Sequence, residues 1–302
     1  MIHPLTKAAA LLGATLFLPV LSAQEKEAIP ATSTGPQVLA TRGASPAPGT
    51  TFTTTRIFAY DHLAMKLTAG GKVTEGTVLR KDTTVETLEG LDAGKLRRTL
   101  TSSRSDGEVT LNGQKSRPPQ KLDSLLETPV ILTRAKGSWI AALEKGEAFR
   151  NQKHSLDTLE KTFNRDFPLA TYGEEPRKPG DKWNADLGAF SPEVFGEFAE
   201  MENIGGTFTL ELLAVTHEKG TPIAKLKAVL DLKGTPKSST AGTFTFKGEG
   251  EILRSIRDQV DLGWRYKAAV SINDPGNEAT GTPATQLSGP YLISGTTIVK
   301  RR

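Results

Sequence analysis

The chain has 302 residues, 37% of them hydrophobic, which is enough to bury one large or two modest cores. Its formal net charge is only +4 and basic residues alternate with acidic ones, so we expect no nucleic-acid partner. The absence of cysteine excludes disulfides, cysteine-ligated metals and a cysteine nucleophile.

The first 23 residues have the three parts of a cleavable signal peptide. Lys7 supplies a positive start, an apolar run covers residues 8–20, and residues 21–23 end in small side chains. The alternative is a membrane anchor. As a helix, however, the run spans about 20 Å, which is shorter than the hydrocarbon core of about 30 Å, and it contains Pro19.

No cysteine follows the apolar run, so we expect no lipid anchor. No later stretch approaches the length and apolar character of a membrane span. We therefore expect an exported bacterial protein, soluble in the periplasm or outside the cell, with no integral membrane span after signal cleavage.

Residues 24–49 are rich in Pro, Ala, Ser, Thr and Gly and lack periodic hydrophobic residues. Such a segment buries too little apolar surface to offset the entropy lost on ordering. It is predicted to be a disordered linker, with the folded protein beginning near Thr50.

Strand signals dominate residues 50–147, which are predicted to form a β-rich lobe. The aromatic residues up to Tyr60 occupy even positions, whereas Leu63 and the next two large hydrophobic residues occupy odd ones, which predicts a bulge near Asp61-His62. Turns are expected at 70–71, 92–94, 106–107, 112–113 and 136–137, and the strands between them at 50–68, 73–88, 95–104, 108–112, 129–134 and 138–143.

A helical connector is expected over residues 148–176. Its helix, 155–167, has a helix-spaced hydrophobic stripe, Ser155 as its cap and Pro168 as its stop. A second short helix is predicted at 192–203, ended by Gly205-Gly206. Both stripes are expected to pack under a sheet, and the alternative is that they bind an apolar ligand.

Residues 177–302 are predicted to form a second β-rich lobe. Its clearest element is 260–272, where hydrophobic residues occupy every even position from Val260 to Ile272. At about 3.3 Å per residue this strand spans roughly 40 Å, and strands of that length usually belong to a curved sheet that wraps a helix or a ligand. Similar motifs at 84–100 and 209–230 fit two related halves, or simply two amphipathic hairpins that look alike.

Chemical motifs are absent. His62, His154 and His217 have no paired metal-ligand spacing, and no nucleophile elbow or phosphate-binding loop occurs. We therefore expect no catalytic residues, no metal and no cofactor, and hence a protein that is not an enzyme. A hydrolase whose site is assembled across the fold is the remaining alternative.

One stretch carries a family resemblance. Residues 177–183 (RKPGDKW) followed by 206–210 (GTFTL) resemble a family of uncharacterised exported bacterial proteins with a β-rich fold and a Pro-Gly-Asp-x-Trp turn. The resemblance implies an envelope location and supplies no catalytic residue. The long hairpins are also similar in architecture to periplasmic half-barrel carriers of lipids and lipoproteins, although fold does not fix function.

The predicted fold class is therefore mainly β, with antiparallel curved sheets in a half-barrel-like arrangement and one or two packed helices. The leading function is binding of a lipid, another apolar small molecule or an envelope protein in the concave groove. The alternative is a structural module of the envelope that acts through its sheet edges. The residues predicted to line the groove are Trp264, Tyr266, Leu262, Phe163 and Phe198.

Overall fold

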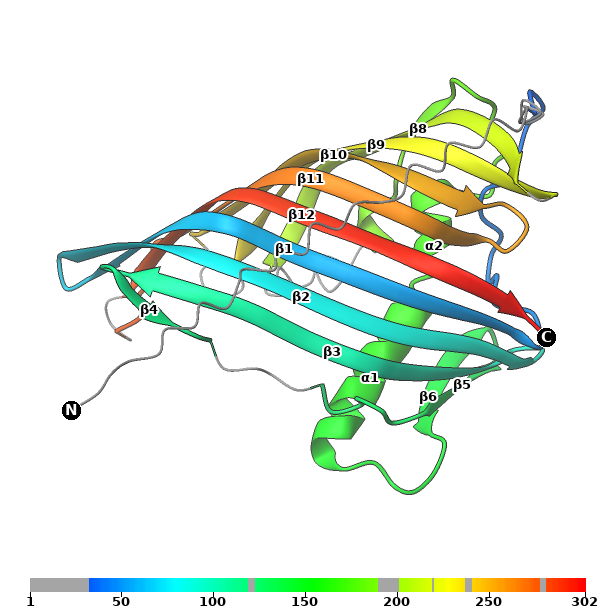
Figure 1. The fold of residues 1–302 in the computed structure, drawn as a ribbon, viewed down its shortest axis with the longest axis horizontal. Coiled ribbons are helices and arrows are strands. Elements are labelled where there is room, and N and C mark those ends of the chain that lie inside the picture. The colour runs from blue at the N-terminus through cyan, green and yellow to red at the C-terminus, as the bar shows by residue number, and fades with distance from the viewer. Residues whose placement is uncertain (1–32, 119–122, 190–200, 219, 237–240, 278–280) are drawn as a thin grey trace, which may run out of the picture. The chain divides into compact units, whose positions relative to one another are not determined.

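The computed structural model describes residues 33–118, 123–189, 201–218, 220–236, 241–277 and 281–302, all within one compact unit that spans 31–302. These residues build a single antiparallel sheet of twelve strands that is not closed (Figure 1). Its order is β6-β5-β3-β2-β1-β12-β11-β10-β9-β8-β7, and β4 pairs with β3. The predicted class, a curved antiparallel sheet with packed helices, is confirmed. The two expected lobes are parts of this one sheet.

The first half of the chain contributes β1 (Thr50–Ala69), β2 (Lys72–Asp92), β3 (Lys95–Leu111), β4 (Gln114–Ser116), β5 (Val130–Ala135) and β6 (Ser138–Leu143). Two helices follow, α1 (Arg150–Asn164) and α2 (Phe167–Tyr172), and they lie behind the strands in Figure 1. The second half contributes β7 (Lys182–Asn184), a 3-10 turn η1 (Leu187–Ala189), β8 (Met201–Glu218), β9 (Thr221–Pro236), β10 (Thr243–Ser255), β11 (Val260–Asp274) and β12 (Ala284–Arg301).

The predicted bulge in β1 is confirmed. The pairing of β1 with both neighbours shifts register after Tyr60, and His62 takes a positive φ of 54°. An extra residue at this point moves the hydrophobic set from even to odd positions, so Tyr60 and Leu63 both face the core.

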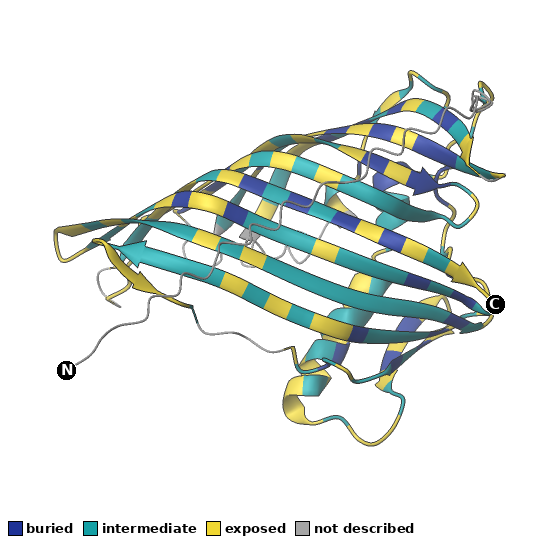
Figure 2. Ribbon diagram, in the orientation of Figure 1, coloured by how far each residue is buried: buried dark blue, intermediate teal, exposed yellow. Residues whose placement is uncertain are grey.

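The strands separate an inner face from an outer face. On β9 every even residue from Ala224 to Leu232 is buried, and Figure 2 shows the alternation of buried and exposed positions along these strands. On the outer face, lysines and acids of β9 and β10 form cross-strand ion pairs, such as Lys247–Asp231 at 3.0 Å. The outer face is therefore solvated, and the inner face carries the core.

Two hydrophobic clusters fill the inner face. The larger joins β8–β12 with α2 and includes Tyr172, Leu226, Phe244 and Phe246. The smaller joins β3, β5, β6 and α1 around Leu132 and Trp139.

The segment at residues 33–49 differs from the expected disordered linker. Leu39 and Ala40 are fully buried in the larger cluster, and Gln37 forms an isolated antiparallel bridge with Arg177. The Leu39 carbonyl accepts a 2.7 Å hydrogen bond from Nε of Arg254. A few hydrophobic contacts, supported by backbone pairing, are enough to order a segment whose composition suggests disorder. Residues 1–32, with the predicted signal peptide and the start of the linker, lie outside the described residues.

The predicted helix 155–167 has different ends. It begins at Arg150, because the Gln152 side chain accepts a hydrogen bond from the otherwise unpaired Phe149 N–H at 3.0 Å. It ends before Asp166, which has a left-handed φ of 45°. Pro168 was expected to stop the helix but lies in the first turn of α2, where a missing N–H costs nothing.

Two further predictions are wrong. Asp106-Gly107 is not a turn, because β3 continues through it with Gly107 opposite Arg80. Gly205-Gly206 does not end a helix but lies within β8. Most of the helix predicted at 192–203 lies outside the described residues, and its last three residues belong to β8.

Candidate functional site

A cavity of about 980 Å³ lies between the inner face of the sheet and the two helices. Strands from both halves of the chain line it, together with α1, α2 and residues 42–46. Most of its wall is apolar. A volume at the upper end of the usual range for small-molecule sites, with a mostly apolar lining and a few polar groups, is typical of a ligand pocket.

Two apolar walls line this cavity. One consists of residues of the smaller cluster, Leu88, Leu96, Trp139, Leu159 and Phe163, together with Phe52 of β1, which is paired with Leu88. The other belongs to the larger cluster and consists of Phe167, Phe208, Leu230, Trp264, Tyr266 and Ile293. Edge-to-face ring pairs hold the aromatic members: Trp139 with Phe163 at 6.1 Å, and Phe208 with Tyr266 at 6.4 Å.

Glycines in neighbouring strands make room for two of these rings. Trp264 is paired with Gly295 of β12, and a Cβ at that glycine would overlap the indole. Tyr266 is paired with Gly250 of β10, where a Cβ would come within 2.5 Å of the phenol ring. Both rings therefore lie against bare backbone, which keeps them close to the sheet and leaves the space beyond them open.

Helix α1 is fixed to the edge strand β6 by side chains. Asn164 accepts a 2.6 Å hydrogen bond from the Trp139 N–H and donates one of 2.9 Å to the Trp139 carbonyl. Glu160 accepts from the Ala141 N–H at 2.8 Å. These contacts hold Leu159 and Phe163 against the cavity. They also occupy the backbone groups through which an edge strand would recruit another strand.

A charged triad forms part of the cavity floor. Glu86 of β2 lies between Arg56 of β1 and Arg98 of β3. Nη2 of Arg56 is 2.5 Å from one carboxylate oxygen, and Nη2 of Arg98 is 3.0 Å from the other. Burial alone would raise the pKa of Glu86, but the two guanidinium groups outweigh it and the pKa lies below its ordinary value.

A second polar cluster closes the α2 end of the cavity. The Tyr172 hydroxyl donates to both carboxylate oxygens of Asp261 at 2.9 Å, and Nη1 of Arg254 lies 2.6 Å from the same carboxylate. The guanidinium of Arg254 also stacks 4.2 Å from the centre of the Tyr172 ring. Burial, and then the charge of Asp261, raises the pKa of Tyr172 well above its ordinary value, so the phenol stays neutral and its role is structural.

Three of the five residues predicted from sequence meet in this cavity: Trp264, Tyr266 and Phe163. Leu262 lies at the register shift between β10 and β11 and is not part of the lining. Phe198 lies outside the described residues. The charged triad was missed, although Arg56 has the same even phase in β1 as the inward Phe52 and Phe58. A charged residue at a position that the alternation assigns to the hydrophobic face was the signal that could have indicated a buried polar group.

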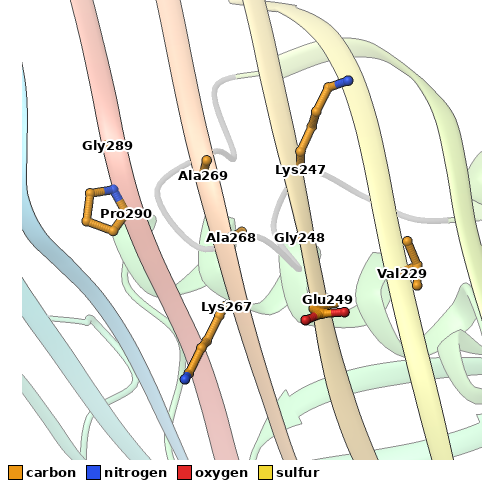
Figure 3. Close-up of a pocket in the computed structure, with 9 residues that line it drawn as sticks. All are labelled: Val229, Lys247, Gly248, Glu249, Lys267, Ala268, Ala269, Gly289 and Pro290. Atoms are coloured by element: carbon orange, nitrogen blue, oxygen red, sulfur yellow. The ribbon is translucent and has the colours of Figure 1, made fainter.

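The outer face carries a shallow hollow over β9–β12 (Figure 3). Val229, Lys247, Glu249, Lys267 and Pro290 surround the small residues Gly248, Ala268, Ala269 and Gly289. The hollow forms where several neighbouring strands carry glycine or alanine, and Ala269 among them is exposed, whereas Ala268 packs against the larger cluster.

Other chemistry is sparse in the described part of the chain. His62 is exposed and pairs with its neighbour Asp61 at 2.8 Å, and neither it nor His154 nor His217 lines the cavity. Within the described ranges, no group of three or more His, Cys, Asp or Glu side chains is arranged to hold a metal ion. In these same ranges, no helix is both long and apolar enough to cross a membrane.

No protein-family model matches the chain, and no curated protein sequence matches it. Among solved structures it is similar to lipovitellin, in a structure described as lipid–protein interactions in lipovitellin, with 8% identity and a TM-score of 0.40. That likeness covers 85% of this chain but only 26% of the lipovitellin chain. A DUF1329 family protein from Desulfovibrio piger is similar at 10% identity and a TM-score of 0.12, over 84% of this chain and 86% of that one. Neither likeness identifies a function.

Proposed function

We propose that the protein is a non-enzymatic binding protein that holds a lipid or another apolar small molecule in the cavity between its sheet and helices. The observation that carries the proposal is the cavity of about 980 Å³ between two aromatic and aliphatic walls. An apolar ligand in such a space is stabilised by about 25 cal/mol for each Å² of apolar surface that it removes from water. The signal-like residues 1–23 support a place of action after export, in the periplasm or outside the cell.

The alternative of a module acting through its sheet edges receives less support. Side chains of α1 cover the edge strand β6, as described above. At the other edge, β7 is only three residues long, and the adjoining β8 also receives backbone hydrogen bonds from Ser33 and Gly180. Short or covered edges are poor templates for strand addition.

The proposal is tested by filling the cavity from α1. Thr158 lines it, whereas its neighbour Asp157 is exposed and does not. A Thr158→Phe variant is expected to bind N-phenylnaphthylamine roughly tenfold more weakly than the parent protein, because the added ring occupies ligand space. Asp157→Phe, the matched control, is expected to bind the dye as the parent does.

Fluorescence titration gives both affinities, and native mass spectrometry with lipid extraction identifies any copurifying molecule. A parent protein that neither binds the dye nor carries a ligand would overturn the proposal. Equal dye binding by the parent and the Thr158→Phe variant would show that the dye sits elsewhere.

A further inference from the structure

We propose that the cavity selects amphiphiles whose hydrocarbon chain ends in a single anionic oxygen head group, a carboxylate or a phosphate, and that Arg56 and Arg98 bind that head group. This inference rests on the proposed function and names its ligand class. It starts from an imbalance of charge, because the triad on the cavity floor holds two guanidinium groups and one carboxylate.

The surplus charge is not cancelled elsewhere. Among the residues that the structure describes, no second carboxylate forms an ion pair with either arginine. The side chain of Arg56 remains 44% exposed while it lines the cavity, so it keeps donors free for a ligand. Arg98 is only 12% exposed and fixes Glu86 with two donors, which orients the pair.

The acids on the cavity wall are already occupied. Asp166 accepts the Gly43 N–H at 2.7 Å, and Asp123 accepts the Leu125 N–H at 2.8 Å. Asp258 pairs with Arg301, and Asp261 with Arg254. Each of these carboxylates is engaged by the protein's own donors. Arg134 also lines the cavity and adds positive charge, but its guanidinium donates to the Gly43 carbonyl at 3.1 Å and lies 5.8 Å from the centre of the Trp139 ring. The triad is the place in the wall where two guanidinium groups converge on one carboxylate.

The surroundings strengthen this charge. Away from bulk water a guanidinium attracts an anion more strongly, and its planar fork matches the oxygens of a carboxylate or phosphate. Leu88 lies two residues from Glu86 on the same face of β2 and is paired with Phe52 of β1, and both of these wall residues line the cavity with the triad. A head group at the triad therefore places an attached hydrocarbon chain between the two apolar walls.

The test compares three ligands with the same twelve-carbon chain: dodecanoate, dodecyl phosphate and the neutral 1-dodecanol. Each is used to displace the bound dye from the full chain at pH 8, the two anions below their micelle concentrations and the alcohol below its solubility limit. The parent protein is expected to bind at least one anion about tenfold or more tightly than the alcohol, as charge-assisted hydrogen bonds imply. The tighter anion shows whether the natural head group is a carboxylate or a phosphate.

Variants of the triad show where the anionic head group is bound. Arg98→Met is expected to remove most of the preference for the anion, whereas Arg97→Met is expected to keep it, because Arg97 pairs with Glu89 and Glu144 and does not line the cavity. Glu86→Gln removes the competing carboxylate and is expected to tighten anion binding. If Arg98→Met does not fold, a triple variant takes its place: Arg56→Met, Glu86→Gln and Arg98→Met together. This neutral combination removes all three charges of the triad, so no buried charge is left without a partner. It is expected to bind all three ligands equally.

The outcomes separate the two proposals. If acid, phosphate and alcohol displace the dye equally from the parent protein, the selectivity is wrong and the binding function stands. An anion preference that survives in the neutral combination would place the head group away from the triad and overturn the inference. If no ligand and no dye binds, the binding function itself fails.

Discussion

At the scale of single residues, the open space in the cavity depends on glycines in the sheet. Trp264 lies over Gly295 and Tyr266 lies beside Gly250, so each large ring occupies room that a neighbouring side chain would otherwise take. Glycine inside a strand weakens it, and its presence at these two positions is explained by the rings that pack on it.

This arrangement predicts the effect of Gly295→Ala. The new methyl group would overlap the indole of Trp264 and push it into the cavity. We expect altered tryptophan emission and several-fold weaker dye binding, measured by fluorescence. Gly263→Ala is the control, because a Cβ there meets only one backbone oxygen, at 4.0 Å. Unchanged emission and dye affinity in Gly295→Ala would contradict this account of the wall.

Glu86 makes a prediction about acid stability. Its folded pKa is below the ordinary 4.5, so it stabilises the folded protein above about pH 4.5, and this contribution is lost as the pH falls through the folded pKa. At neutral pH, Glu86→Gln is expected to lower the free energy of unfolding by roughly 2 kcal/mol. In urea titrations, parent and variant curves should converge below pH 4.5. A constant difference down to pH 2 would exclude this role, and the exposed Glu249→Gln serves as control.

The same residues show what sequence reveals about a site. Alternation along 260–272 predicted Trp264 and Tyr266 on the inner face, and helical spacing predicted that Phe163 packs under the sheet; all three line the cavity. The triad was not predicted, because it is assembled from three strands whose register is set by the sheet and not by local sequence. Leu262 follows the same alternation, but it is the residue that β11 skips at the register shift with β10, and it is not part of the lining.

At the scale of elements, local pattern predicted the strands better than the segments between them. The bulge in β1 could be seen in the phase of its hydrophobic residues, and the turn at Gly70-Gly71 in its glycines. The ordering of residues 33–49 could not be predicted from local sequence, since it depends on contacts with β10 and with Arg177, both far away in sequence.

That segment gives a stability prediction. Leu39 is fully buried, whereas Val38 beside it is 39% exposed. Leu39→Ala is expected to lower the free energy of unfolding by about 2–5 kcal/mol, because it leaves a cavity in the larger cluster. Val38→Ala should change it by about 0.5 kcal/mol or less. Urea unfolding measures both, and equal small effects would mean that the segment is not part of the core.

At the scale of the whole sheet, the pairing of β1 with β12 joins the two halves of the chain. The smaller cluster comes from the first half and α1, whereas the larger one comes mainly from the second half and includes Tyr60 and Leu63 of β1. Residues of both clusters line the cavity. Strand length predicted a curved sheet, but not which strands would be neighbours. The binding space is thus a property of the assembled sheet and helices, which explains why no short motif in the sequence marks it.

The most direct measurement is therefore an isotope-edited NOE experiment with ¹³C-labelled dodecanoate. If the ligand lies between the two walls, its chain protons will show contacts with the indole protons of Trp139 and Trp264. Contacts confined to Val229 and Pro290 on the outer face, or no intermolecular contacts at a saturating concentration, would contradict the proposed binding function.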